Sequence, residues 1–269
     1  MTKGTMGVIG CPILEDELVY SLCNDREHRN LFVVDGPVSR SFRDKLSKKG
    51  LPFTPIDGWE FDNGFVEIDE TAFNIVVIMN KLGLHSDPKL LRKTLEDQLI
   101  QYRHRFDSVA LYYGMCGNAM WDVSKWASAS LNRPVFVFRD ENDEVCDDCI
   151  GVAVGGHSCY CDFVRKHAGM LFVTPAIAGN WKDFSKEMDM VKGYDIMDIH
   201  TVKGVFELFG YKYMVKIDTG IGISGEELEE GFRHVSEITG LEMTMPRSGS
   251  VDLYPAERLY SDAKGALMQ

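Results

Sequence analysis

Short hydrophobic runs alternate along the first half of the chain with segments in which hydrophobic residues recur every three or four positions. The runs predict β-strands and lie at residues 6–10, 31–35, 53–56, 73–80, 108–114 and 133–138. Residues 73–80 and 108–114 are hydrophobic at nearly every position, as is typical of parallel strands covered on both faces. The segments predicted as helices are 13–23, a basic stretch ending near Lys49, 86–106 and 118–131, while glycine and asparagine predict a loop or hairpin over 57–68.

The second half of the chain continues the alternation. Strands are predicted at residues 170–174, 211–218 and 241–245, and helices near 146–155, 158–166, 182–191, 198–209 and 226–240. Strands that alternate with helices predict the α/β class, with a doubly wound and mostly parallel sheet or sheets. We expect one α/β unit over residues 1–269. It would have lobes of about 1–140 and 141–269 and a cleft at the carboxyl ends of the strands.

The composition is that of an ordinary globular protein with an acidic surface. The 269 residues carry a formal charge of −12 and are 45% hydrophobic. Such a balance argues against nucleic acid as a partner, since binding the phosphate backbone needs clustered lysines and arginines. No stretch is long and apolar enough to predict a membrane-spanning helix, and the N-terminal residues lack the features of a signal peptide. We therefore expect a cytoplasmic protein, in which seven cysteines serve metal binding or catalysis more readily than disulfides.

Three of the cysteines follow predicted strands. Cys11 follows strand 6–10, Cys116 follows strand 108–114, and Cys149 follows strand 133–138 after an acidic loop. Loops at the carboxyl ends of parallel strands converge on one crevice, where ligands bind. Three thiols there would form a metal site or a site of thiol chemistry. Cys116 is also expected at the start of the helix 118–131, where the helix dipole would stabilise its thiolate and make it a catalytic nucleophile.

A second, local set of ligands competes for Cys149. This set contains Cys146, Cys149, Cys159 and Cys161, with His157 nearby, and would form a zinc clip or an iron–sulfur site. Its second pair is C-x-C, which departs from the usual zinc-ribbon spacing. The pair Cys146 and Cys149 could also be a redox C-x-x-C, and a buried cysteine can serve simply as a small hydrophobic residue.

Other candidates lie outside the cysteines. His85 follows strand 73–80 and could reach the same crevice as a catalytic base or a metal ligand. Gly220, Gly222 and Gly225 form a literal G-x-G-x-x-G between a strand and a helix, which indicates a dinucleotide or adenosyl cofactor, a bound anion, or a structural turn. Trp181 could form the floor of a cofactor or ligand pocket.

Several short motifs in this order resemble an uncharacterised prokaryotic family known as domain of unknown function 1638. The matching segments are Cys11, 84–88 (LHSDP), 113–118 (YGMCGN), 147–150 (DDCI) with the glycines at 155–156, 172–181 (FVTPAIAGNW) and 216–222 (KIDTGIG). Carried over from the family, the cysteines are Cys11, Cys116 and Cys149. Asp147 stands where the family pattern has histidine, and residues 156–162 (GHSCYCD) are particular to this chain. The resemblance implies no established activity, but it implies a setting of methanogens and other anaerobes that carry corrinoid-dependent methyltransferases.

Three functions follow as hypotheses. The first is an enzyme with a metal, zinc first, held by Cys11, Cys116 and Cys149, with His85 as fourth ligand or base. It would transfer a methyl or other one-carbon group, or act on thiols, with a small-molecule substrate or a corrinoid or methyltransferase protein as partner. The second is a non-catalytic accessory protein that binds a metal, an iron–sulfur cluster, a corrinoid or another cofactor. The third is a metal-free enzyme with Cys116 as nucleophile.

Overall fold

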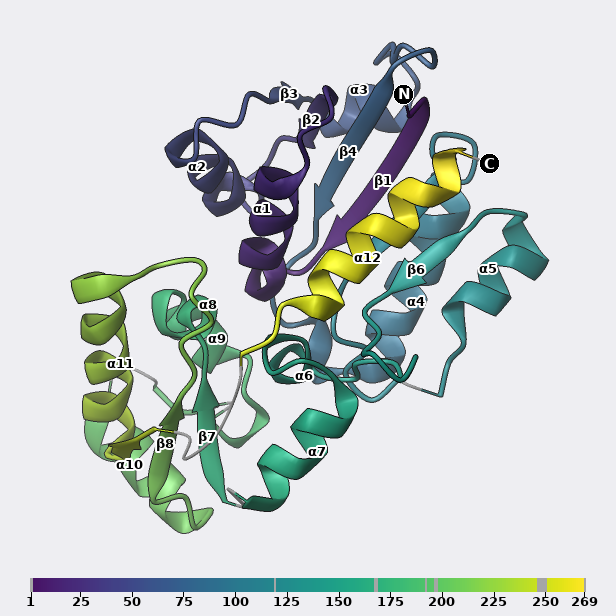
Figure 1. The fold of residues 1–269 in the computed structure, drawn as a ribbon. Coiled ribbons are helices and arrows are strands. Elements are labelled where there is room, and N and C mark those ends of the chain that lie inside the picture. The colour runs from purple at the N-terminus through teal and green to yellow at the C-terminus, as the bar shows by residue number, and fades with distance from the viewer. Residues whose placement is uncertain are drawn as a thin grey trace.

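The computed structural model describes residues 2–118, 120–166, 169–191, 193–195, 198–245 and 251–268. Two parallel sheets organise them (Figure 1). The N-terminal sheet has the order β3-β2-β4-β1-β5-β6, and the C-terminal sheet has the order β7-β8-β9. The predicted doubly wound α/β class is confirmed.

The strands of the N-terminal sheet come from the first 137 residues. They are β1 (Gly4–Gly10), β2 (Asn30–Val34), β3 (Thr54–Ile56), β4 (Phe73–Met79), β5 (Ser108–Tyr112) and β6 (Val135–Val137). The C-terminal sheet consists of β7 (Met170–Val173), β8 (Tyr213–Lys216) and β9 (Glu242–Thr244). Every strand pair within both sheets is parallel.

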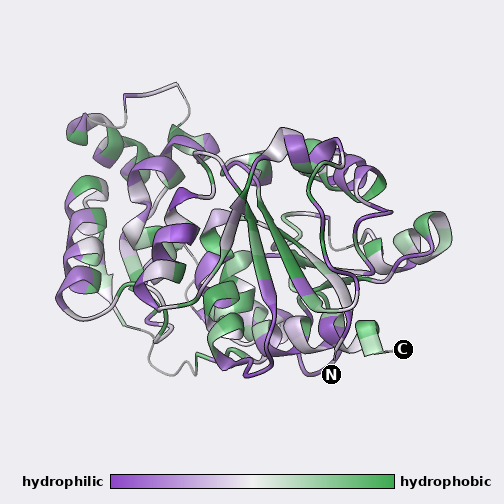
Figure 2. Cartoon of the chain, turned by 90° about the horizontal axis from the view of Figure 1, so that it is seen from above, coloured by the Kyte–Doolittle hydropathy of each residue, from purple (hydrophilic) through white to green (hydrophobic). Residues whose placement is uncertain are grey.

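Helices cover both faces of the N-terminal sheet. One face packs against α1 (Glu15–Asn24), α2 (Arg40–Lys48) and α12 (Tyr254–Gly265), and the other against α3 (Gly58–Asp62), α4 (Pro88–Gln101) and α5 (Val123–Leu131). Successive side chains of a strand point to opposite faces, so Met6 and Val8 enter the first core while Ile9 enters the second. In Figure 2 the hydrophobic colour runs along the strands between the helices, as expected for a sheet buried on both faces.

The remaining helices lie between the two sheets or around the C-terminal sheet. They are α6 (Cys149–Ala153), α7 (His157–Lys166), α8 (Pro175–Gly179), α9 (Trp181–Lys186), α10 (Ile199–Leu208) and α11 (Gly225–Thr239). Short 3-10 helices occupy Pro12–Leu14, Leu84–Ser86, Asp189–Val191 and Ala266–Met268. None of the helices among the described residues combines the length and hydrophobicity that a membrane crossing requires.

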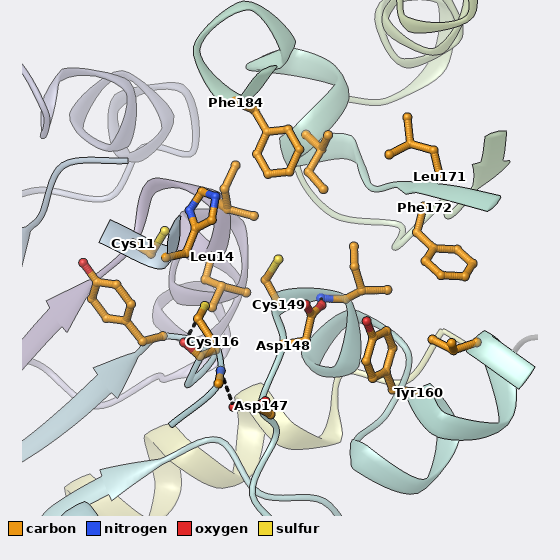
Figure 3. Close-up of a pocket in the computed structure, with 18 of the residues that line it drawn as sticks. Cys11, Leu14, Cys116, Asp147, Asp148, Cys149, Tyr160, Leu171, Phe172 and Phe184 are labelled. Atoms are coloured by element: carbon orange, nitrogen blue, oxygen red, sulfur yellow. Dashed lines mark hydrogen bonds between the residues drawn. The ribbon is translucent and has the colours of Figure 1, made fainter. Parts of the chain in front are cut away.

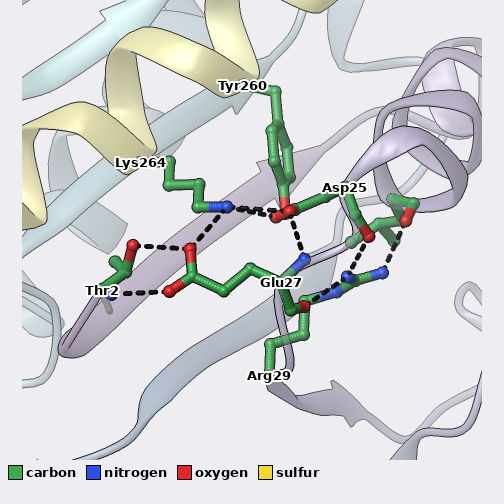
Figure 4. A network of polar contacts seen from close by, with 7 residues as sticks. Thr2, Asp25, Glu27, Arg29, Tyr260 and Lys264 are labelled. Atoms are coloured by element: carbon green, nitrogen blue, oxygen red, sulfur yellow. Dashed lines mark hydrogen bonds and ion pairs between the residues drawn. The ribbon is translucent and has the colours of Figure 1, made fainter.

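The last helix returns to the first sheet. Helix α12 packs beside β5, β6 and α1, across the face of the N-terminal sheet (Figure 1). A polar network fixes its end (Figure 4): Tyr260 donates to Asp25 at 2.7 Å, and Lys264 contacts Asp25 at 2.8 Å and Glu27 at 3.0 Å. Glu27 in turn accepts hydrogen bonds from the backbone and hydroxyl of Thr2. The two ends of the described chain are thereby held together.

Some predicted elements differ from the structure. The predicted helix 118–131 is shorter and starts at Val123, because the Asp122 side chain accepts from the Lys125 N–H and caps the helix there. The predicted loop 57–68 contains α3, which Asp57 caps. The predicted helix 146–155 is reduced to α6, and no helix was predicted at α8 or α12.

Candidate functional site

A pocket with a volume of about 540 Å³ lies where the carboxyl ends of four N-terminal strands meet residues of the C-terminal sheet. Cys11 enters it from the end of β1, His85 from the loop after β4, Cys116 from the loop after β5, and Cys149 from the start of α6, beyond β6. The three cysteines that the sequence places at strand ends therefore line one pocket (Figure 3). Its size is in the range of small-molecule sites.

The loop that carries Cys116 is tied to the loop that carries Cys149. The Cys116 N–H donates to the Asp147 carbonyl at 2.5 Å, and the Gly117 N–H donates to the Asp147 side chain at 2.9 Å. A methyl group on Gly114 would lie 2.7 Å from the Cys149 backbone nitrogen and 2.8 Å from the Asp148 carbonyl carbon. Glycine at position 114 is thus what allows the two loops to approach.

Cys116 itself has an unusual backbone. Its φ of 47° lies in the left-handed region, which residues other than glycine rarely adopt. Such conformations persist only where surrounding contacts hold them, and they cluster at functional sites. The expected helix start is absent: α5 begins seven residues later, so its dipole does not act at Cys116.

The other two cysteines begin helical segments. Cys11 precedes the 3-10 helix Pro12–Leu14 and α1, and Cys149 is the first residue of α6, which Asp148 caps by accepting from the Ile150 N–H at 2.6 Å. The segment order of strand, thiol and helix start is therefore correct for Cys11. Because α6 has only five residues, it contributes little dipole to Cys149.

All three thiols are protonated at neutral pH in the absence of a cation. Burial raises the pKa of Cys11 to about 12, with Glu15 and Glu17 adding to the shift. Burial also raises the pKa of Cys116 and of Cys149, and Asp148 raises both further. The helix start that was expected to stabilise the Cys116 thiolate is absent, and desolvation favours the neutral thiol.

Among the described residues, the pocket is lined by acidic side chains and by one imidazole, that of His85. Asp147 and Asp148 line it, and no lysine or arginine does so among the described residues. Burial, with a contribution from Asp147, raises the pKa of Asp148. This wall of thiols and carboxyls is rich in donors for a cation.

The opposite wall is hydrophobic and aromatic. It is formed by Leu171 and Phe172 of β7, Phe184 of α9 and Tyr211 just before β8, while Tyr160 of α7 lies beside Asp148. Figure 3 shows Phe184, Leu171 and Phe172 across the pocket from the labelled cysteines. Sequence reasoning missed this wall, because it depends on how the second sheet sits against the first.

His85 lines the pocket and stacks on Phe184, with ring centroids 6.0 Å apart and planes at 20°. Burial lowers the pKa of His85, although Glu187 and Asp189 oppose the shift. The imidazole is therefore neutral at pH 7 and can accept a proton or bind a metal.

A buried carboxyl near the thiols was also missed. Glu17 of α1 is 4% exposed, and its Oε2 has no hydrogen-bond partner among the described residues. Burial, with Asp16 next, raises the pKa of Glu17 to about 8. Its neighbours Glu15 and Asp16 are paired with Lys45 at 2.9 and 2.5 Å. The sequence gives no sign of this burial, because three successive acidic residues usually indicate a solvated helix start.

The remaining predicted site residues lie elsewhere. Trp181 is buried in the core of the C-terminal sheet and contacts Phe184 from behind, with ring centroids 6.2 Å apart. Gly220 borders a different cavity with Asp218, Asp252 and Glu257. A methyl group on Gly222 would meet the Asp16 carboxylate. Gly225 begins α11 with a φ of 61°. The carboxylates around this glycine loop do not suit a bound anion.

The local cysteine set does not assemble around Cys149. Cys146 is buried in the core beneath α1, α2 and α12, and Cys159 is exposed. The Sγ atom of Cys161 lies 3.5 Å from the Nε2 atom of His157, which is one turn earlier in α7. Of this set only Cys149 lines the pocket.

Across the described part of the chain, no three Cys, His, Asp or Glu side chains are already arranged around one point that could hold a metal ion. The chemistry of the donor set nevertheless fits a soft or borderline cation: three half-buried cysteines, two carboxyls and a neutral imidazole line one pocket. Binding would require the thiols to turn toward a common point.

The fold and the pocket define a two-sheet parallel α/β protein with a thiol-lined site at the strand ends. Residues 79–254 match the model of a family described as protein of unknown function (DUF1638), and the chain belongs to this family. Cys116 and Cys149 lie within the match, and Cys11 lies before it. No curated protein and no solved structure matches the chain.

Proposed function

We propose that the protein is a metal-dependent transferase in which Cys11, Cys116 and Cys149 hold a metal ion, with zinc as the first choice. The reaction would be transfer of a methyl or other one-carbon group, or another thiol-directed transfer. The observation that carries this proposal is that thiols from three separate segments of the chain line one pocket. A zinc ion with three protein ligands keeps a fourth position open for a substrate thiol or water.

The charge of the pocket supports a bound cation. Three thiols whose pKa values are raised by burial are poor nucleophiles without one. When bound, a zinc ion would supply the positive charge that keeps a coordinated thiol deprotonated. The carboxyls of Asp147 and Asp148, and the lack of lysine or arginine among the described lining residues, add to the preference for a cation.

Other residues have distinct parts in this proposal. Gly114 and Asp147 hold the two cysteine loops together. His85, neutral and supported by Phe184, would accept the proton of an incoming substrate thiol or serve as a fourth ligand. The aromatic wall would exclude water from the reacting groups.

The proposed substrate is a small molecule, in keeping with the pocket volume of about 540 Å³. The setting implied by the family resemblance adds a corrinoid-carrying methyltransferase protein as the proposed partner.

A second candidate is a non-catalytic accessory protein with an iron–sulfur cluster. The observation that favours it is that no three described side chains are ready to share a single ion. A cluster bridges wider gaps between cysteines than one ion does.

Metal analysis of anaerobically purified protein separates these functions. We expect about one zinc per chain, as a three-cysteine site implies, with loss of most of it in Cys116→Ser and Cys149→Ser. Cys159→Ser, which changes an exposed cysteine outside the pocket, should retain the metal. Iron with acid-labile sulfide would favour the second candidate. Metal-free protein with one rapidly alkylated thiol would contradict both.

A further inference from the structure

The two walls of the thiol pocket differ in chemistry. One wall carries three cysteines, Asp147 and Asp148, and the rest of the lining includes aromatic side chains from four segments of the chain. The aromatic side chains are Tyr160, Phe172, Phe184 and Tyr211. A ligand that fills the pocket must therefore satisfy an acidic wall and a set of aromatic rings at once.

The acidic wall excludes an anionic ligand. No lysine or arginine is found among the described residues that line the pocket, and a zinc ion held by three thiolates would already be neutralised. A phosphate or carboxylate would therefore lose its hydration without gaining an uncompensated positive charge. The pocket resists added negative charge.

The aromatic wall is held in place from behind. Phe172 packs against Phe163 with ring centroids 4.8 Å apart, and Phe184 is supported by Trp181 at 6.2 Å. Rings fixed in this way present their faces and edges at little cost in conformational entropy. The negative face of an aromatic ring attracts a cation, more strongly where water is excluded.

We infer that the ligand of this pocket is a small organic cation that carries apolar substituents on its charged centre, such as an alkylated ammonium or sulfonium compound, and no anionic group. The inference names the substrate class of the transferase site and rests on the proposed function to that extent. The charged centre lies between the carboxyls and the aromatic rings, and the apolar substituents contact Leu171 and Ile177.

Three probes of equal shape test the inference. Choline carries a trimethylammonium group, 3,3-dimethylbutan-1-ol is its neutral isostere, and 3,3-dimethylbutanoate is an anion of similar size. Isothermal titration of the anaerobically purified, metal-loaded protein should give an affinity for choline about tenfold above that for the alcohol, as a desolvated cation–aromatic contact provides. The anion should bind more weakly than both.

Single substitutions in the pocket test which side chains cause the preference for choline. Asp148→Asn keeps a residue that can cap α6 but removes its charge, and Phe184→Leu removes a ring but keeps an apolar side chain. Each should weaken choline binding several-fold and leave the binding of the neutral alcohol nearly unchanged. Phe209→Leu, which removes an exposed ring outside the pocket, is the matched control.

Equal affinity for choline and the alcohol, tighter binding of the anion, or no choline binding at millimolar concentration would each overturn the inference. The metal content of every preparation is measured in parallel. If the protein binds zinc but does not prefer choline, the substrate class is refuted and the metal-dependent function is not. A preference for choline in protein that never takes up metal supports the substrate class and refutes the metal-dependent function.

Discussion

At the scale of single residues, the site depends on groups that are costly to bury. Cys11, Cys116 and Cys149 are half-buried, and each thiol has a raised pKa because a thiolate there would be poorly solvated. Glu17 belongs to the same environment, since its charge contributes to the raised pKa of Cys11 and of Cys149. The protonation states of these side chains therefore depend on one another. A bound cation would favour their deprotonated forms.

Replacing Glu17 by glutamine should stabilise the metal-free protein at alkaline pH. The folded protein holds the Glu17 proton up to a pKa of about 8, whereas the ordinary value is 4.5. The favourable contribution of this group to the free energy of unfolding is complete below pH 4.5 and is lost as the pH rises to about 8. Chemical denaturation at pH 9 should show a gain of a few kcal/mol for Glu17→Gln, since one pKa unit is worth about 1.4 kcal/mol.

At pH 4.5 the same variant should have nearly the stability of the parent. Glu230→Gln, which removes a carboxyl that is 71% exposed, is the control and should change little at either pH. A Glu17→Gln variant that is equally destabilised at both values would show that the carboxyl is charged and compensated in the folded state.

At the scale of elements, the strands could be predicted from sequence and the ends of several helices could not. Buried parallel strands such as β4 and β5 are hydrophobic at nearly every position, and few other elements of that length have this pattern. The start of α5 was misplaced because both Asn118 and Asp122 are residue types that cap helices. Asn118 instead donates its side-chain N–H to the Pro88 carbonyl. Helix α8 was missed because it has five residues and directly follows a strand.

Gly114→Ala should separate the two cysteine loops. The added methyl group would meet the backbone of Asp148 and Cys149, which cannot move aside as a flexible side chain can. We expect a loss of about 1–3 kcal/mol in stability, the usual result of overpacking, together with weaker metal binding. Denaturant titration and metal competition with a chelator measure the two effects.

Gly204→Ala in helix α10 makes the same chemical change where nothing lies within 4 Å. It should stabilise the protein by about 0.5–1 kcal/mol, because alanine is a better helix former. Equal effects of the two substitutions would contradict the close loop contact at Gly114.

At the scale of the whole molecule, the pocket is a product of how the two sheets meet. The cysteine wall could be predicted, since the carboxyl ends of parallel strands share one edge and Cys11, Cys116 and Cys149 each follow a strand. The aromatic wall could not, because Phe172 and Phe184 reach the pocket only through the placement of the second sheet. The packing of α12 could not be predicted either, because this helix lies at the end of the sequence but packs on the N-terminal sheet.

The anchor of α12 should be pH-dependent. Burial raises the pKa of Asp25, but hydrogen bonds from Lys264 and the Glu27 backbone outweigh burial. Together they leave the pKa of Asp25 below its ordinary value of 3.8. The carboxylate therefore stabilises the fold above that value and ceases to do so as the pH falls through its lowered pKa. Lys264→Met should cost about 2 kcal/mol at pH 7, as loss of hydrogen bonds to a charged group does. The difference in stability between Lys264→Met and the parent protein should shrink when unfolding is measured in acid.

Lys93→Met is the matched control for this lysine. Lys93 forms an exposed pair with Asp97, at 71% and 62% exposure, and such pairs contribute about 0.5 kcal/mol or less. If both variants have the same small effect, the network around Asp25 does not anchor the helix.

The central claim is that three cysteines from separate strand ends share one metal ion. X-ray absorption spectroscopy at the zinc edge of the anaerobically loaded protein tests it most directly, because it counts the sulfur ligands. If the three cysteines share the ion, the spectrum will show three sulfur atoms at about 2.3 Å, and two in Cys11→Ser, whose cysteine lies outside the local set. A zinc ion with no more than one sulfur ligand, or with four sulfurs that persist in Cys11→Ser, would contradict it.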